Sequence, residues 1–322
     1  MPRRRALLSS AFEMNKKIII FLVVIAAIGA AVYVFFFLFQ RQIVPSKPGF
    51  KRGTVRVAAA ENFYGDIARQ LGGAHVSVIS ILSDPNVDPH EYESDVQDGI
   101  EIANAGIVIE NGLQYDTWMD KLLSASPNPR RIVITAGNVS PRLLPENPHV
   151  WYGIDNIGAI AKAIAAALEK ADPADKQVFE NNLAVFEGSL APIRQKMNEI
   201  KAKYAGTPVA LTETIYLYQT RTMGLDVLTP FDYEKAVAEG NDPPARSISV
   251  TDRQVSGRQV KVLIYNSQTV TPITTNLQNA ARKNSIPVVP VSETMPRGVT
   301  YQKWMLNELN ALEQALAQAT GR

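Results

Sequence analysis

The chain of 322 residues contains no cysteine and only three histidines, His75, His90 and His149. The absence of cysteine excludes disulfide bonds, thiolate metal sites, a cysteine nucleophile and a lipid-modified N-terminal cysteine. It leaves the redox compartment open, because a cysteine-free chain is stable in either. The composition, 46% hydrophobic and 20% charged, is that of an ordinary globular protein, and the length suffices for two domains with separate cores.

Charge is distributed unevenly along the chain. Nine of the 33 Lys and Arg residues but only one of the 31 acidic residues lie in positions 1–52, which gives this segment a net charge of +8. The remaining positions hold 24 basic and 30 acidic residues, a net charge of −6. Because nucleic-acid phosphates require a basic surface, this acidic body argues against a nucleic-acid partner.

An apolar run of 22 residues, 18–39, follows a basic segment at 1–17. The run exceeds the ~20 residues that a membrane-spanning helix needs, and the positive charges before it favour a body outside the cytoplasm. We expect a transmembrane anchor at 18–39 and a tether at 40–53. A cleaved signal sequence is the competing interpretation, although the run is longer than the usual ~7–15 residues and lacks a small-residue cleavage site. Met1 and Met14 are alternative starts.

Short β-branched runs alternate with helical patterns in the rest of the chain, and this alternation predicts an α/β fold with parallel sheets covered by helices. Residues 156–205 are almost wholly helix-forming, and a helix from 174 to 204, kinked at Pro192, resembles a strut. We therefore expect two lobes, 54–155 and 206–322, each a roughly four-stranded parallel sheet with flanking helices, joined by this helix. A surface helix of a single domain is the alternative. The predicted strands are Val55–Ala59, Val76–Leu82, Ile107–Ile109, Ile132–Ile134, Pro208–Thr212, Val260–Tyr265 and Ile286–Val291.

Two of the histidines directly follow a proline, in Asp88-Pro89-His90-Glu91-Tyr92 and Asn147-Pro148-His149-Val150-Trp151. Imidazole is the commonest nitrogen ligand of transition metals, and a preceding proline favours turns over helix interiors. Two hydrogen-bonded loop histidines without a metal are the alternative. The third histidine, His75, lies in a predicted turn before a strand, and we expect it to be a surface residue.

Two carboxylates occupy matching positions in the second half. Glu213 follows the predicted strand 208–212, and Glu293 follows the strand 286–291. Two ligands from each lobe would close a four-coordinate site in the cleft, where ligands favour the carboxyl ends of strands. Either glutamate could instead be a solvated helix-start residue. For the fourth ligand, water and Asp252 are the alternatives to Glu293.

These motifs resemble the zinc/manganese-binding solute receptors of bacterial ABC transporters, over about residues 55–319. The resemblance rests on Asp88-Pro89-His90, Glu110-Asn111-Gly112-Leu113, Asn147-Pro148-His149 and Glu239-Gly240 to Pro244, together with Glu213 and Tyr218. The family pattern implies metal ligands at His90 and His149. Its third ligand is His in typical zinc members and Glu in typical manganese members, here Glu213. Its fourth ligand is usually Asp; here no Asp fits, and Glu293 is the nearest carboxylate.

The resemblance implies an extracytoplasmic, monomeric receptor that captures Zn²⁺ or Mn²⁺ as its transported ligand and delivers the ion to a membrane permease, with no enzymatic activity. Affinity order favours zinc for two imidazoles, while two carboxylates also suit manganese. An extracellular metal-dependent hydrolase is the alternative, although the chain has no His-Glu-x-x-His and no Gly-x-Ser-x-Gly motif. A surface adhesin with a structural metal is a third interpretation.

Overall fold

The computed structural model describes residues 53–322 except 85–86, 88, 90 and 91. The expected membrane anchor and nearly all of the tether, as well as His90, therefore lie outside the described residues. Among the described helices, none is long and apolar enough to cross a membrane. Both sheets belong to one compact unit, Phe50–Arg322.

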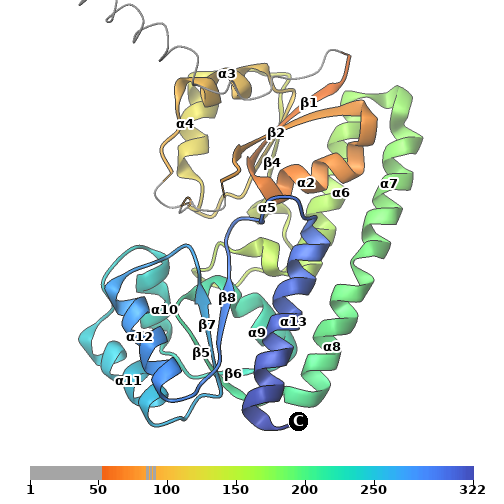
Figure 1. The fold of residues 1–322 in the computed structure, drawn as a ribbon. Helices are drawn as coiled ribbons and strands as arrows, with labels where there is room; N and C mark the ends of the chain where they lie inside the picture. Colours follow the sequence, from red (N-terminus) through yellow and green to blue (C-terminus); the bar gives the residue numbers. More distant parts are fainter. Residues whose placement is uncertain (1–52, 85–86, 88, 90–91) are drawn as a thin grey trace, which may run out of the picture. The chain divides into compact units, whose positions relative to one another are not determined.

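The first sheet has four parallel strands in the order β2-β1-β3-β4 (Figure 1). Its central strands are buried on both faces, as expected of parallel strands that helices cover. The strand bounds are β1 Val55–Glu61, β2 Val76–Leu82, β3 Ile107–Glu110 and β4 Ile132–Thr135. The order reverses between β1 and β3, and such a switch point opens a crevice at the carboxyl ends of the strands.

The second sheet repeats this plan in the order β6-β5-β7-β8, again all parallel. Its strands are β5 Pro208–Leu211, β6 Asp226–Val227, β7 Val262–Asn266 and β8 Val288–Val291. The prediction of an α/β fold with two four-stranded parallel sheets is confirmed. The sequence pattern missed β6, because a strand of two residues is too short to show a period.

Helices cover both sheets. In the first half these are α2 Asn62–Gly72, α3 Val96–Asn104, α4 Thr117–Ala125, α5 Ala136–Val139 and α6 Ile154–Ala171. In the second half they are α9 Leu217–Met223, α10 Phe231–Ala238, α11 Ala245–Ser256, α12 Pro272–Lys283 and α13 Tyr301–Thr320. Short 3-10 turns occur at Gly73–His75 (η1), Val150–Tyr152 (η3), Pro173–Asp175 (η4) and Thr214–Tyr216 (η5).

A broken long helix runs past both sheets. It consists of α7 Lys176–Ser189 and α8 Ala191–Tyr204, with the break at Leu190, two residues before Pro192. The position of the break agrees with the predicted kink, since proline removes a helical hydrogen bond and fits the first turn of a new helix. Helix α7 packs on α2 and α6, and α8 packs on α9 and α13, so one segment is attached to both halves (Figure 1).

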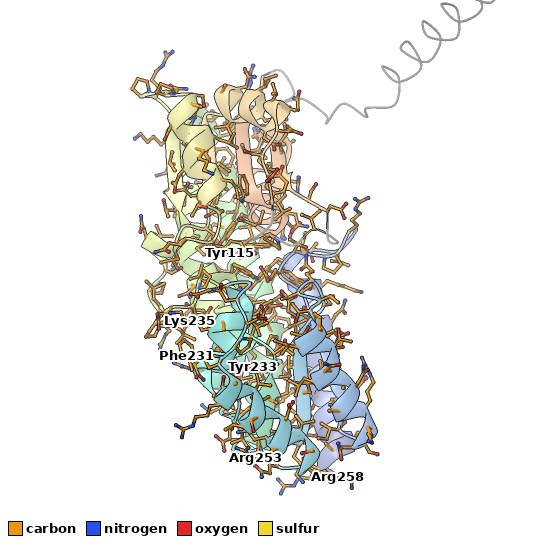
Figure 2. All side chains as sticks on the ribbon, turned by 90° about the vertical axis from the view of Figure 1, so that its left-hand side faces the viewer. Tyr115, Phe231, Tyr233, Lys235, Arg253 and Arg258 are labelled. Atoms are coloured by element: carbon orange, nitrogen blue, oxygen red, sulfur yellow. The ribbon has the colours of Figure 1, made fainter. Side chains whose placement is uncertain are left out.

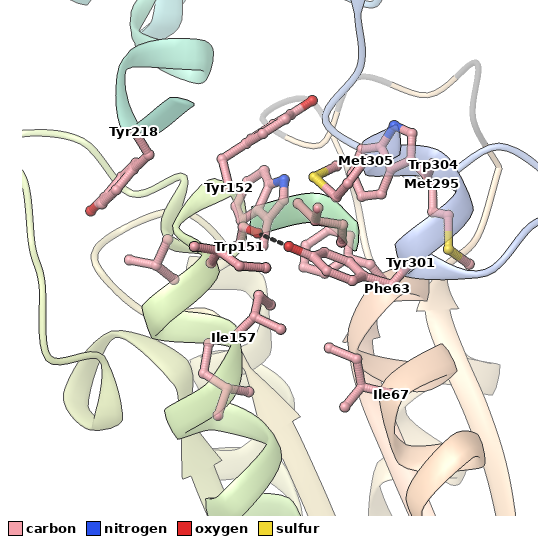
Figure 3. Close-up of a cluster of buried hydrophobic side chains, with 14 of the residues drawn as sticks. Phe63, Ile67, Trp151, Tyr152, Ile157, Tyr218, Met295, Tyr301, Trp304 and Met305 are labelled. Atoms are coloured by element: carbon pink, nitrogen blue, oxygen red, sulfur yellow. Dashed lines mark hydrogen bonds between the residues drawn. The ribbon is translucent and has the colours of Figure 1, made fainter. Parts of the chain in front are cut away.

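A buried aromatic cluster joins the two halves beside this helix (Figure 3). The ring of Phe63 on α2 stacks on Trp151 of η3 at 4.7 Å and lies 5.9 Å from Trp304 of α13. The hydroxyl of Tyr301 donates to the backbone oxygen of Trp151 at 2.7 Å. Burial of each such ring contributes roughly 1.5–3 kcal/mol. The cluster thereby fixes the backbone immediately after His149.

Candidate metal centre

His149 lies in the loop between α5 and α6 and is fully buried. Its ring packs edge-on against Trp151 at 5.1 Å and Tyr115 at 5.9 Å. Two aromatic neighbours leave the imidazole little rotational freedom. The predicted turn at Pro148-His149 is present, because His149 precedes the 3-10 turn η3.

Asn147 orients His149. Its Oδ1 accepts hydrogen bonds from the backbone N–H of His149 at 3.0 Å and lies 2.9 Å from ring atom Nδ1. An amide oxygen can only accept, so Nδ1 carries the proton and Nε2 keeps its lone pair for a metal. The Nδ2 of Asn147 donates to the backbone oxygen of Thr214 at 2.7 Å. The same side chain therefore sets the tautomer of His149 and contacts the loop of Glu213.

Glu213 and Glu293 emerge from the carboxyl ends of two strands of the second sheet. Glu213 lies between β5 and η5, and Glu293 lies just after β8; both side chains are fully buried. The Oε1 of Glu293 accepts from Asn266 Nδ2 at 2.6 Å, and its Oε2 accepts from the hydroxyl of Tyr115 at 2.7 Å. The two donors fix the orientation of this carboxylate. Tyr115 belongs to the first half, so this bond crosses between the halves.

The structure brings three of the four predicted ligands together. One nitrogen of His149 and one oxygen each of Glu213 and Glu293 all lie within 4.8 Å of one another. Such spacing suits a shared ion, because metal–ligand distances of about 2.0–2.2 Å put neighbouring ligand atoms some 3–4 Å apart. Asp252, the alternative to Glu293, is an exposed residue of α11 and does not belong to this group.

His90, the fourth predicted ligand, lies outside the described residues. The structure describes Val87, three residues before His90 in the same loop. The backbone oxygen of Val87 accepts a hydrogen bond from Gln268 Nε2 at 2.9 Å. The Oε1 of Gln268 also accepts from the backbone N–H of Glu293 at 2.6 Å. One glutamine thus contacts both the loop that carries His90 and the backbone of Glu293.

His75 lies elsewhere in the fold, as expected of a residue outside the predicted site. It ends the 3-10 turn η1 directly before β2, and its side chain is 34% exposed. Its Nδ1 pairs with Asp175 at 2.5 Å.

Further carboxyl groups are buried in the first half of the chain. Glu61, at the end of β1, is fully buried, and neither of its oxygens has a hydrogen-bond partner in the described part of the chain. Burial first, and then the charge of Asp116, raise the pKa of Glu61 well above its usual range. Burial also raises the pKa of Asp116 to about 7. The negative charge of Glu293 also raises the pKa of Glu61. A cation bound at the candidate site would reduce the repulsion between these two carboxylates.

Sequence reasoning did not identify Glu61, Asn147 or Tyr115. Glu61 is the last residue of β1, a position close to those of Glu213 and Glu293, so the strand-end rule used in the second half could have identified it. Asn147 and Tyr115 carry no such pattern, because their roles depend on contacts across the fold.

A cavity of about 930 Å³ reaches this region from the surface. Its lining includes Asn147 and Thr214, the direct neighbours of the ligand loops. An ion pair between Lys235 of α10 and Glu146 lies on its wall, and Tyr115 is above Lys235 in Figure 2. The cavity brings solvent next to the residues that flank His149 and Glu213, while the ligand side chains themselves are fully buried.

Comparisons with known proteins agree with this fold. The iron-binding protein YfeA of Yersinia pestis is 26% identical over 149 residues, 43% of this chain and 47% of that protein. The manganese ABC transporter substrate-binding lipoprotein PsaA of Streptococcus pneumoniae is 26% identical over 192 residues, 53% of this chain and 60% of that protein. The chain thus matches about half the length of these curated relatives.

A solved structure, the periplasmic zinc-binding protein TroA of Treponema pallidum, superposes with a TM-score of 0.70 at 18% identity and covers 82% of this chain and 99% of its own. The substrate-binding protein FpvC of Pseudomonas aeruginosa, in complex with Mn²⁺, gives a TM-score of 0.68 at 21% identity, over 83% and 99% of the two chains. At these identities the likeness concerns the fold. The family model "ZnuA: Zinc-uptake complex component A periplasmic" matches residues 57–315, and the chain therefore belongs to the ZnuA family.

Proposed function

We propose that this chain is an extracytoplasmic receptor that captures one divalent transition metal, Zn²⁺ or Mn²⁺, between its two halves and delivers it to an ABC permease. The observation that carries the proposal is the group of His149, Glu213 and Glu293, fully buried and with ligand atoms within 4.8 Å of one another. His90 is the proposed fourth ligand, and the contact between Gln268 and Val87 supports a position of its loop beside Glu293.

The charges of the four groups suit this role. Two neutral imidazoles and two carboxylates bring a charge of −2 to a divalent cation, so the bound ion forms a neutral complex. Four protein ligands leave no open position for a reactive water. This is the arrangement of structural metal sites, whereas catalytic sites keep one position for water or substrate. Capture and release therefore fit these ligands better than hydrolysis, the alternative function.

The proposed ligands can bind either zinc or manganese. Named relatives are described as binding zinc, manganese or iron, in TroA, PsaA and YfeA respectively. Imidazole ligands favour zinc in the general affinity order, whereas carboxylates also accept manganese. Metal analysis of the chain purified from its native host decides between the two ions.

We propose that residues 54–155 and 206–322 act as lobes and that 156–205, with α7 and α8, limits their relative movement. Because α7 packs on the first half and α8 on the second, release is expected through small shifts of the ligand loops and without wide opening. We further propose that residues 18–39 anchor a monomeric receptor at the outer side of the membrane beside its permease.

Calorimetric titration of the chelator-stripped full chain tests the function. We expect one tight equivalent of Zn²⁺ or Mn²⁺, and its loss in His149→Ala because an incomplete set of ligands remains. The control Asp252→Asn removes a carboxylate from the exposed face of α11 and should bind as the parent does. No tight binding of either ion by the parent would exclude the proposal. Esterase, phosphatase or peptidase activity that depends on His149 would favour the hydrolase instead.

A further inference from the structure

A second group of metal-ligating side chains lies near the amino end of strand β2 in the first sheet. One nitrogen of His75 and one carboxylate oxygen each of Asp172 and Asp175 all lie within 4.8 Å of one another. His75 directly precedes β2, so it lies at the amino end of that strand. The ligands of the candidate metal centre instead follow the carboxyl ends of strands, and the two groups are separate.

Two turns bring these side chains together. Asp172 precedes the turn η4 between α6 and α7, Asp175 ends that turn, and His75 ends the turn η1 between α2 and β2. Because α7 packs on α2, the two turns meet at one end of this helix pair. Ligands from separate turns are what a metal needs in order to connect two segments of a fold.

Because Nδ1 of His75 pairs with one oxygen of Asp175, the atoms left for a cation are Nε2 of His75, the other oxygen of Asp175 and the carboxylate of Asp172. The carboxylate of Asp175 pairs with Nδ1 of His75, and the carboxylate of Asp172 has no hydrogen bond or ion pair within the described residues. The neighbouring Lys176 forms salt bridges with Glu169 at 3.1 Å and Glu180 at 3.4 Å. It forms none with Asp172 or Asp175 among the described residues. Two carboxylates and an imidazole therefore remain without a neutralising lysine.

Exposure determines what kind of site this is. The side chains of His75 and Asp175 are each 34% exposed, so water can complete the coordination of a bound ion. Asp172 also lines a surface cavity of about 470 Å³, which gives it solvent access. Arg56 lines the same cavity, and its positive charge lowers the affinity for a cation. These features predict weaker binding than at the buried centre.

We propose that His75, Asp172 and Asp175 form a second divalent transition-metal site, with water as the remaining ligands. A neutral imidazole and two carboxylates bring −2, which neutralises a divalent ion, and this ligand set is one that Zn²⁺ accepts. The bound ion connects the start of β2 to the turn that opens α7, the helix that reaches toward the other half of the chain. The site is independent of the proposed transport of metal by His149, Glu213 and Glu293.

Zn²⁺ binding to the purified full chain in the His149→Ala background tests this inference, because the buried centre is impaired there. One weaker equivalent should remain in His149→Ala, and adding either His75→Ala or Asp172→Asn should weaken its binding by at least about tenfold. Asp172→Asn leaves the pair of His75 and Asp175 intact, so its effect does not arise from a broken ion pair. Asp242→Asn is the matched control, since Asp242 is exposed and belongs to no such group.

The same variants in the parent chain separate the two sites. His75→Ala alone should keep the tight equivalent and lose the weaker one. If the weaker equivalent persists unchanged in Asp172→Asn, or if His149→Ala binds no Zn²⁺ at all, the second site does not exist. If the tight equivalent is absent from the parent while the weaker one is present, the transport proposal fails and this site stands.

Discussion

Asn147 Oδ1 lies 2.9 Å from Nδ1 of His149, and the Nδ2 of the same Asn147 reaches across to the backbone oxygen of Thr214. This side chain therefore links the tautomer of one proposed ligand to the position of another, Glu213. Outer partners of this kind usually change metal affinity by 10–100-fold when they are lost.

The two roles of Asn147 can be separated by substitution. Asn147→Ala loses both contacts, and we expect the Zn²⁺ affinity to fall by about 10–100-fold. Asn147→Asp keeps an acceptor for Nδ1–H of His149 but turns a carboxylate oxygen toward the backbone oxygen of Thr214, so it should recover only part of the affinity. Calorimetric titration gives both values. Equal losses in the two variants would show that the tautomer of His149 does not depend on this contact.

Of the proposed ligands, Glu293 has the weakest support from the sequence. In the structure its carboxylate is held by Asn266 and Tyr115. Glu293→Gln keeps the size of the side chain and removes its charge, which leaves the complex at about +1. We expect the Zn²⁺ affinity to fall by well over tenfold, about 1.4 kcal/mol or more. Parent-like affinity in Glu293→Gln would show that this carboxylate is not a ligand and leave the role of His149 untouched.

Tyr115 supports Glu293 from the other half of the chain. Tyr115→Phe removes the hydroxyl that donates to Oε2 of Glu293 and keeps the ring packed on His149 and Trp151. We expect a smaller loss of affinity than in Glu293→Gln, because the carboxylate retains the bond from Asn266. In the Glu293→Gln background the same substitution should add little. Additive losses, measured in a double-mutant cycle, would show that Tyr115 acts by another route.

Gly112 fixes the loop that carries Asn111, whose Nδ2 donates to the backbone oxygen of Pro148. Its φ is +71°, and a Cβ there would lie 2.4 Å from Cγ2 of Thr135. Gly112→Ala should therefore lower the free energy of unfolding by roughly 1–3 kcal/mol, measured by urea denaturation.

Thr135→Ser provides the control for Gly112. It removes Cγ2 and keeps the hydroxyl that donates to Glu110 at 2.7 Å. Added to Gly112→Ala, it should restore the part of the stability that the clash costs, while the strain of the positive φ remains. A Gly112→Ala chain as stable as the parent would contradict this account of the loop.

Glu308 of α13 predicts how stability depends on pH. It accepts hydrogen bonds from Tyr152, Trp304 and the backbone N–H of Ser292, yet burial raises its pKa to about 8 from its ordinary value of 4.5. Between these pH values the folded chain holds a proton that the unfolded chain has lost. The free energy of unfolding therefore falls as the pH rises, by at most about 1.4 kcal/mol per pH unit from this group.

Urea denaturation of the metal-free chain between about pH 5 and pH 8 measures this slope. Glu308→Gln binds no such proton, so its slope should be flatter than that of the parent. Glu313→Gln on the same helix is the control: hydrogen bonds from Lys196 and Lys203 lower the pKa of Glu313, so it is ionised in both states across this range. Identical slopes in the parent and in Glu308→Gln would contradict the assignment.

The sequence predicts the strands well and the second half's helices less well. The bounds of strand Val76–Leu82 are predicted correctly because four of its seven residues are Val or Ile. Helix α11 was missed because its buried residues, Ser247, Thr251 and Val255, include only one hydrophobic side chain, so hydrophobic periodicity is absent. Helix α10, with eight residues, is likewise absent from the helices predicted from the sequence.

The candidate site shows the same limit. Its proposed ligands can be predicted, since each follows a strand or a proline in the sequence. The groups that hold them, Asn147 and Tyr115, act through contacts between residues as far as 178 positions apart, and no local pattern encodes such contacts. Glu61 is an intermediate case, because its position at the end of β1 can be predicted from the sequence whereas its burial cannot.

Anomalous X-ray diffraction at the zinc edge, from crystals of the full chain grown with one equivalent of Zn²⁺, tests the central claim most directly. The account predicts one dominant peak within about 2.0–2.2 Å of Nε2 of His149 and of carboxylate oxygens of Glu213 and Glu293, with His90 as the fourth ligand. A dominant peak elsewhere, or a zinc ion that does not contact His149, Glu213 and Glu293 together, would contradict it.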